Sequence, residues 1–214
     1  MTRASNAFSV LQAVAATVAI AVALWSVGLP SLPFAEAANV TTYSDTLSDS
    51  APSVVSNHTI VFTTPTGVAN TETITLDFSD GPFVVGSVDY TDIDVATTSG
   101  EFSLAADCTG SEMASAAFSG TTLTITMCSG DGSSIAANGT TTIEIGTNAT
   151  NQTTGDQQLT NPAAGSRQIP LTAGSADTGE TRVAILDNVT VTAAVDTVFN
   201  FSVAGVAGGT LVNT

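Results

Sequence analysis

Apolar and polar residues alternate in short runs along most of the chain after residue 37. The segment 73–78, TITLDF, places Ile74, Leu76 and Phe78 on one side and polar residues on the other. Because successive side chains of a β-strand point to opposite faces, this period of two predicts a strand with one buried face. The same kind of pattern predicts further strands at 40–46, 58–64, 84–88, 93–96, 102–106, 114–118, 123–127, 141–145, 169–171, 182–186, 189–193 and 198–203.

Turn-forming residues separate these runs, as in Pro65-Thr66-Gly67 and Asp80-Gly81-Pro82. The hairpin signal Ser119-Gly120 separates two of the expected strands. The longest polar interval, 148–165, has no aromatic residue and is predicted to be a loop. Short strands at intervals of about 8–12 residues are typical of an antiparallel sandwich or barrel. A sandwich is favoured because each strand has a single apolar face, as two packed sheets require.

The segment 1–37 has the features of a signal peptide. Arg3 is its only basic residue, an uncharged helix-forming core covers 13–29, and the sequence Ala-Glu-Ala ending at Ala37 is a small-residue cleavage site. An uncleaved membrane anchor is the alternative, since the apolar core approaches the roughly 20 residues that span a bilayer. In both cases Arg3 favours an N-terminus that stays inside, so the rest of the chain is expected outside the cytoplasm.

The chain is expected to have three parts. After the signal peptide, residues 38–187 are long enough for one β-sandwich domain. Residues 188–214 contain the last expected strands and a Gly-rich end. These strands either close the sandwich, begin a further domain, or pair with a neighbouring copy by strand addition.

The charge balance excludes one class of function. The chain has 3 basic and 19 acidic residues, a net charge of −16, and no lysine. Nucleic-acid binding needs clustered Lys and Arg to displace counterions from phosphate, so no nucleic-acid partner is expected. Contact with a membrane is expected only through the N-terminal segment, if that segment is not cleaved. The acidity serves either solubility or the binding of divalent cations.

Two cysteines, Cys108 and Cys128, are predicted to form a disulfide. An even number of cysteines in an exported chain favours this, and with two the pairing is unique. In the chain-entropy picture, closing a loop of about 20 residues stabilises the fold by roughly 3 kcal/mol.

Four stretches carry a resemblance to a known group of proteins. They are 56–95, 141–150, 155–165 and 176–193. Together they resemble secreted β-sandwich surface proteins predicted in uncultivated, small-genome bacterial lineages. The resemblance implies an all-β, immunoglobulin-like antiparallel β-sandwich at the cell envelope, preceded here by the signal-peptide helix. That group has no assigned activity, so the resemblance implies no catalytic residues.

No arrangement in the sequence favours catalysis, and we predict that the protein is not an enzyme. A Ser-His-Asp triad would need His58, the one histidine, for which a turn-forming or exposed position is expected. No G-x-S-x-G elbow supplies a nucleophile. Glycoside cleavage needs two carboxyl groups held about 5–10 Å apart, and the sequence does not place any two glutamates together. The available ones are Glu72, Glu101, Glu112, Glu144 and Glu180.

The acidic stretch SVDYTDIDV suggests a calcium site at Asp89, Asp92 and Asp94. Calcium binds six to eight oxygens from carboxylates, carbonyls and amides. Asp92 and Asp94 are expected on one strand face and Asp89 on the other, with Asp131 as a further loop carboxylate. The alternative is a solvated acidic edge that discourages unwanted sheet pairing.

The expected function is therefore that of a structural or adhesive module, secreted or at the cell surface. Its partners would be other copies or envelope components, contacted through strand edges or loops. The alternative is a calcium-dependent or carbohydrate-binding extracellular module that recognises glycans. No cofactor is expected other than calcium.

Overall fold

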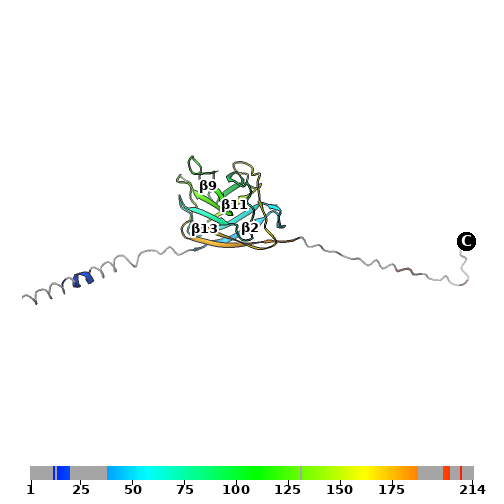
Figure 1. Cartoon of the computed structure of the whole chain (residues 1–214), viewed down its shortest axis with the longest axis horizontal. Coiled ribbons are helices and arrows are strands. Elements are labelled where there is room, and N and C mark those ends of the chain that lie inside the picture. The colour runs from blue at the N-terminus through cyan, green and yellow to red at the C-terminus, as the bar shows by residue number, and fades with distance from the viewer. Residues whose placement is uncertain are drawn as a thin grey trace, which may run out of the picture.

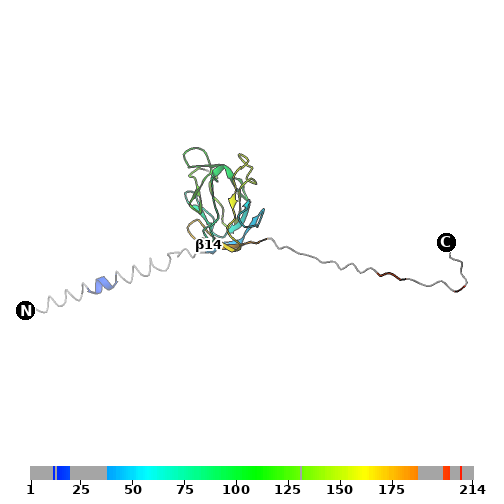
Figure 2. The same cartoon turned by 45° about the vertical axis from the view of Figure 1, so that its right-hand side comes forward.

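The computed structural model describes residues 12, 14–19, 38–130, 132–187, 200–202 and 208. Most of the expected signal peptide and most of the expected strands 189–193 and 198–203 therefore lie outside the described residues. Residues 14–19 are helical. Among the described residues, no helix is long and apolar enough to cross a membrane. The described strands gather into one body, with β14 along its lower border (Figures 1 and 2).

The body consists of short strands and one 3-10 helix, η1 (Tyr90–Asp92). In chain order the strands are β1 (Ala38–Asn39), β2 (Thr41–Leu47), β3 (Val55–Ser56), β4 (His58–Thr64), β5 (Thr73–Asp77), β6 (Ile93–Thr97), β7 (Gly100–Glu101), β8 (Leu104–Ala105), β9 (Ala114–Ser119), β10 (Thr122–Met127), β11 (Gly139–Ile145), β12 (Leu159–Thr160), β13 (Gly165–Ala173) and β14 (Asp177–Ile185).

These strands form two main sheets. The larger sheet has the order β1-β14-β13-β5-β10-β9-β8, and the smaller has the order β2-β4-β11-β6-β7. A third, two-stranded sheet joins β12 to β3. Most neighbours are antiparallel, but β1 runs parallel to β14 and β8 runs parallel to β9. Both parallel pairs involve two-residue strands at the two ends of the larger sheet, and short edge strands limit pairing with other chains.

The core lies between the two main sheets. In β4, residues 58, 60, 62 and 64 are buried and the residues between them are only partly buried. β5 and β10 alternate in the same way, so that Ile74, Leu76, Leu123 and Ile125 are completely buried. One-sided apolar strands therefore pack face to face, and the predicted all-β sandwich is confirmed.

Hydroxyl groups line the outer face of the larger sheet. Strand register places Thr172 of β13 opposite Thr178 of β14 on one side and opposite Thr75 of β5 on the other. Thr75 in turn lies opposite Thr124 of β10. These threonines are the polar positions of the alternating pattern in four neighbouring strands. Threonine is favoured there because its β-branched side chain packs well on a pleated, half-exposed surface.

Several predictions about strands and loops differ from the structure. The expected strand 102–106 is too long, because within it only Leu104–Ala105 form a strand. The expected loop 148–165 contains β12 at Leu159–Thr160, and β13 begins at its last residue, Gly165.

The expected strand 84–88 is wrong, because within it only Val84 makes a bridge, to Thr160. A turn at residues 86–87 interrupts the run, and Gly86 has a positive φ of 63°. The expected strands 169–171 and 182–186 are too short, since β13 and β14 pair over nine residues each. Both strands carry polar residues on their outer face, so the apolar runs in the sequence are shorter than the strands themselves.

Candidate functional site

Three acidic residues predicted to act together lie where η1 and β6 meet the loop 146–158. Asp89 caps η1: its Oδ1 accepts hydrogen bonds from the Thr91 backbone N–H at 2.8 Å and from the Thr91 hydroxyl at 2.6 Å. Asp92 completes a capping box, because its Oδ2 accepts the Asp89 backbone N–H at 3.0 Å. The hydrogen bonds from Thr91, first the hydroxyl and then the amide, hold the pKa of Asp89 below its usual value.

Asp92 also reaches the far end of the loop. Its Oδ1 accepts the backbone N–H groups of Asp156 at 2.7 Å and of Gln157 at 2.8 Å. The residue is only 1% exposed. One buried carboxylate thus satisfies three backbone donors, which is the compensation that a buried charge requires.

Asp94 does the same at the near end of the loop. Its Oδ2 accepts the backbone N–H of Thr150 and, at 2.7 Å, that of Asn151. Asn57 adds a third attachment, because its Oδ1 accepts the Thr147 backbone N–H at 2.9 Å and the Gln158 side-chain amide at 2.6 Å. The loop is therefore fixed to η1, to β6 and to the residue that precedes β4, at several points along its length.

This arrangement bears on the two interpretations of the acidic stretch. A solvated edge is wrong for Asp92 and Asp94, which are buried. Asp92 belongs to η1 and Asp94 to β6, so the two are not on one strand face as expected. Within the described part of the chain, no group of three or more His, Cys, Asp and Glu residues is placed to hold a metal ion. Asp131 lies outside that part, and calcium binding stays a prediction.

A pocket of about 310 Å³ opens beside Asp94. Polar groups and one aromatic ring share its wall with aliphatic side chains. The loop contributes Gln152, whose Oε1 accepts the backbone N–H of Leu104. The lining residues are Tyr90, Thr91, Ile93, Asp94, Leu104, Ala105, Gln152 and Thr153. Such a mixture can hold a small polar ligand with an apolar face.

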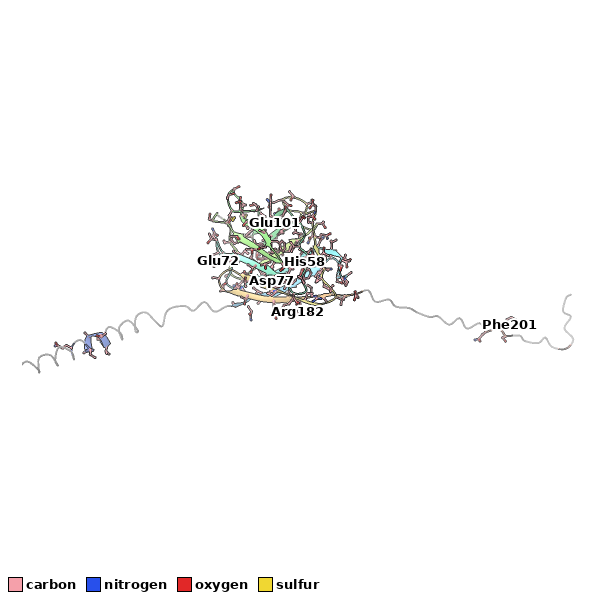
Figure 3. All side chains as sticks on the ribbon, viewed as in Figure 1. His58, Glu72, Asp77, Glu101, Arg182 and Phe201 are labelled. Atoms are coloured by element: carbon pink, nitrogen blue, oxygen red, sulfur yellow. A yellow bond between two sulfur atoms is a disulfide. The ribbon has the colours of Figure 1, made fainter. Side chains whose placement is uncertain are left out.

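Two of the five glutamates considered for catalysis lie close together. Glu144 of β11 lies opposite Asp94 of β6 and interacts electrostatically with Glu101, the residue labelled in Figure 3. Burial, followed by the charges of Asp94 and Glu101, raises the pKa of Glu144, while a hydrogen bond from Asn148 opposes that rise.

The other three glutamates serve local backbone or side-chain contacts elsewhere. Glu72 accepts the Ala69 backbone N–H and Glu112 accepts the Gly110 backbone N–H, both at 2.8 Å. Glu180 accepts a hydrogen bond from the side chain of Gln168.

His58 is buried, so the expectation of an exposed or turn-forming histidine is wrong (Figure 3). Its Nδ1 lies 2.7 Å from Asp45 Oδ2, and the side chains of both residues are completely buried. The imidazole ring packs edge-on against Phe78 and Phe83. Burial, with a smaller contribution from the Asp45 charge, raises the pKa of the neighbouring Tyr43 far above its usual range. His58 has the same strand parity as Ile60 and Phe62, and that signal could have placed it in the core.

The predicted disulfide is confirmed. Cys108 and Cys128 are bonded, with their Cα atoms 5.4 Å apart. Cys128 follows β10 directly, whereas Cys108 lies in the exposed segment between β8 and β9. The bond therefore ties that segment to the end of a central strand.

Comparisons with known proteins add little. No family model matches the chain, and no curated protein matches it. Among solved structures, the crystal structure of BslA, a bacterial hydrophobin, is similar with a TM-score of 0.40 and 11% sequence identity. The match covers 70% of this chain and 98% of that one. A similarity this low carries no argument about function.

Proposed function

We propose that the chain is a non-enzymatic structural or adhesive module that works at the cell surface or in the extracellular space. The observation that carries this proposal is the attachment of the loop 146–158 by buried carboxylates. Asp92 and Asp94 accept four backbone N–H groups of that loop. A long loop held in one shape by a rigid sandwich is what a display or adhesion module needs, because binding then costs little ordering entropy.

The location outside the cytoplasm has separate support. The disulfide between Cys108 and Cys128 favours an oxidising compartment. The signal peptide expected over 1–37 points the same way. Immunogold labelling of cells that make the protein is expected to decorate the envelope, and label confined to the cytosol would contradict the proposal.

Hydrogen exchange tests the display property directly. In the purified chain without any ligand, the amides of Thr150, Asn151, Asp156 and Gln157 are expected to exchange slowly, because each donates to a carboxylate. Asp92→Ala is expected to speed exchange at 156–157 much more than at 150–151. Fast exchange across the whole loop in the parent chain would contradict a preformed display surface.

A second candidate, a carbohydrate-binding module, rests on the pocket beside Asp94. Tyr90 offers a ring on which a sugar can pack, while Gln152, Thr153 and Asp94 offer hydrogen-bonding groups. A glycan array with the purified chain tests this, with Gln152→Ala as the pocket variant and Gln157→Ala as a loop control outside the pocket. Calorimetric titration with calcium tests the calcium-dependent version, for which heat release and a raised melting temperature are expected.

A further inference from the structure

Three side chains that can react with one another meet on the outer face of the smaller sheet. Thr59 of β4 lies directly opposite Glu144 of β11. Asn148 follows three residues after β11, and its Nδ2 donates to the Thr59 Oγ1 at 3.1 Å and to the His58 carbonyl at 3.2 Å. Thr59 and Asn148 are 89 positions apart in the sequence, so only the folded sandwich brings the hydroxyl to the carboxamide.

The carboxamide of Asn148 is held by its nitrogen alone. Its Oδ1 is buried and has no hydrogen-bond partner among the described residues. A buried acceptor without a donor costs free energy, so only the nitrogen half of this carboxamide is satisfied. The Thr59 Oγ1 lies 3.1 Å from the amide nitrogen, which is one covalent bond away from the carbonyl carbon.

Glu144 is placed to move the protons. It lies directly opposite Thr59 in the register of β11 and β4, shortly before the turn that carries Asn148. Burial, and then the charges of Asp94 and Glu101, raise the pKa of Glu144, so this group exchanges a proton closer to neutral pH than an ordinary glutamate. Carboxyl groups with raised pKa values are suited to acting first as base and then as acid.

We propose that Thr59 and Asn148 join in an intramolecular ester, with Glu144 as the proton carrier. The Thr59 Oγ1 attacks the Asn148 Cγ, a bond forms between these two atoms, and the bond from Cγ to Nδ2 breaks. Glu144 takes the hydroxyl proton and delivers it to the departing nitrogen, which leaves as ammonia. Glu144 ends unchanged, and the reaction needs no oxidant, reductant or other reactant.

Folding brings the Thr59 hydroxyl and the Asn148 carboxamide together. Holding a nucleophile beside its target turns a bimolecular reaction into an intramolecular one, which can raise its rate by many orders of magnitude. The product would tie β4 covalently to the residue where the loop 146–158 begins. The larger sheet has the disulfide at the end of β10, so the ester would give the smaller sheet its own covalent tie.

Mass spectrometry of the purified full chain tests the proposal. After reduction of the disulfide, the intact mass is expected to be lower than the sequence mass by one ammonia. Digestion after glutamate separates Thr59, on the peptide ending at Glu72, from Asn148, on the peptide between Glu144 and Glu180. In the cross-linked protein these two peptides are expected to travel as one species, which hydroxylamine separates because it cleaves esters. An intact mass equal to the sequence mass would overturn the proposal.

Variants distinguish the ester from other losses of ammonia. Thr59→Val keeps the side-chain shape without the hydroxyl and is expected to restore the full mass, as is Glu144→Gln. Thr63→Val is the matched control, because Thr63 lies on the same outer face of β4 and contacts the hydroxyls of Thr42 and Thr140. It is expected to keep the cross-link. Loss of ammonia that persists in Thr59→Val would mean that an asparagine such as Asn138, which precedes Gly139, or Asn148 has closed on its own backbone, and it would refute the ester. A cross-link that persists in Glu144→Gln would refute the role of Glu144.

Discussion

Two irregular segments of the sandwich are fixed by different chemistry. The segment between β8 and β9 is exposed from 106 to 111 and is held by the bond from Cys108 to Cys128. The loop 146–158 follows β11 and is held by Asp92, Asp94 and Asn57, without any covalent bond to a cysteine. The first attachment depends on an oxidising environment, and the second depends on carboxylates remaining charged.

The contrast shows how this chain manages buried negative charge. With 19 acidic residues and only 3 basic ones, cations are too few to pair with each buried carboxylate. Asp92 and Asp94 obtain their compensation from backbone N–H groups instead, and those groups belong to a loop that would otherwise leave them unsatisfied. The same hydrogen bonds therefore compensate the buried carboxylates and attach the loop. The disulfide attaches its segment but compensates no buried charge.

The largest expected effect comes from removing the Asp92 carboxylate. Asp92→Ala leaves the backbone donors of Asp89, Asp156 and Gln157 without their acceptor, and we expect a loss of about 4 kcal/mol in the free energy of unfolding. Denaturant unfolding followed by circular dichroism measures this, since the one tryptophan of the chain lies in the segment 1–37. Asp156→Ala, in the same loop but exposed, is expected to change stability by less than about 0.5 kcal/mol. Equal stability of the two variants would show that Asp92 does not carry the attachment.

Removing the disulfide should have the next largest effect. The double variant Cys108→Ser with Cys128→Ser frees a loop closed across 20 positions and is expected to lose about 3 kcal/mol. Its hydrogen exchange should rise between 106 and 113 and stay unchanged between 146 and 158. Faster exchange in both segments would mean that the two attachments are coupled rather than independent.

Local pattern predicted most of the strands and the disulfide. Alternation predicted the strand at 58–64, and the Ser119-Gly120 turn signal predicted the hairpin of β9 and β10, where Gly120 has a φ of 62°. These features depend on neighbours in sequence, or, for the cysteines, on there being a single pairing. His58 lies at the same strand parity as the buried Ile60, which indicates that His58 is buried too. We predicted an exposed position instead because histidine is a polar residue.

The roles of Asp92, Asp94 and Asn148 could not be predicted in this way. Asp92 reaches Asp156 across 64 positions and Asp94 reaches Thr150 across 56. A carboxylate can accept a backbone N–H from any residue except proline. The sequence of the loop therefore does not show which of its residues donate to Asp92 and Asp94. The acidic run therefore suggested calcium or a solvated edge, and the loop at 148–165 showed no sign of its attachment.

A smaller effect is expected at the helix cap. Asp89→Ala removes two hydrogen bonds to Thr91 and should cost about 1 kcal/mol at neutral pH. Because those bonds lower the pKa of Asp89, its contribution is present above the ordinary aspartate value and is lost as the pH falls through the lowered value. Unfolding curves measured from neutral to acidic pH should therefore converge for parent and variant. Asp107→Ala is the matched control, since Asp107 makes the same two bonds to Thr109 outside any helix. It should cost less than Asp89→Ala.

The smallest effect is expected at Glu144, measured in the Thr59→Val background so that no ester can form. Its raised pKa means that, above the ordinary glutamate value, the folded state keeps a proton that the unfolded state has lost. Stability should then fall as the pH rises from that value through the raised one, and Glu144→Gln should remove this fall. The variant is therefore expected to be more stable than its parent at pH 7, by less than about 1 kcal/mol because solvent screens a partly exposed group. Glu101→Gln should reduce the fall without removing it, since it takes away one of the two neighbouring charges. A Glu144→Gln variant whose stability fell with pH as steeply as its parent would show that another group titrates there.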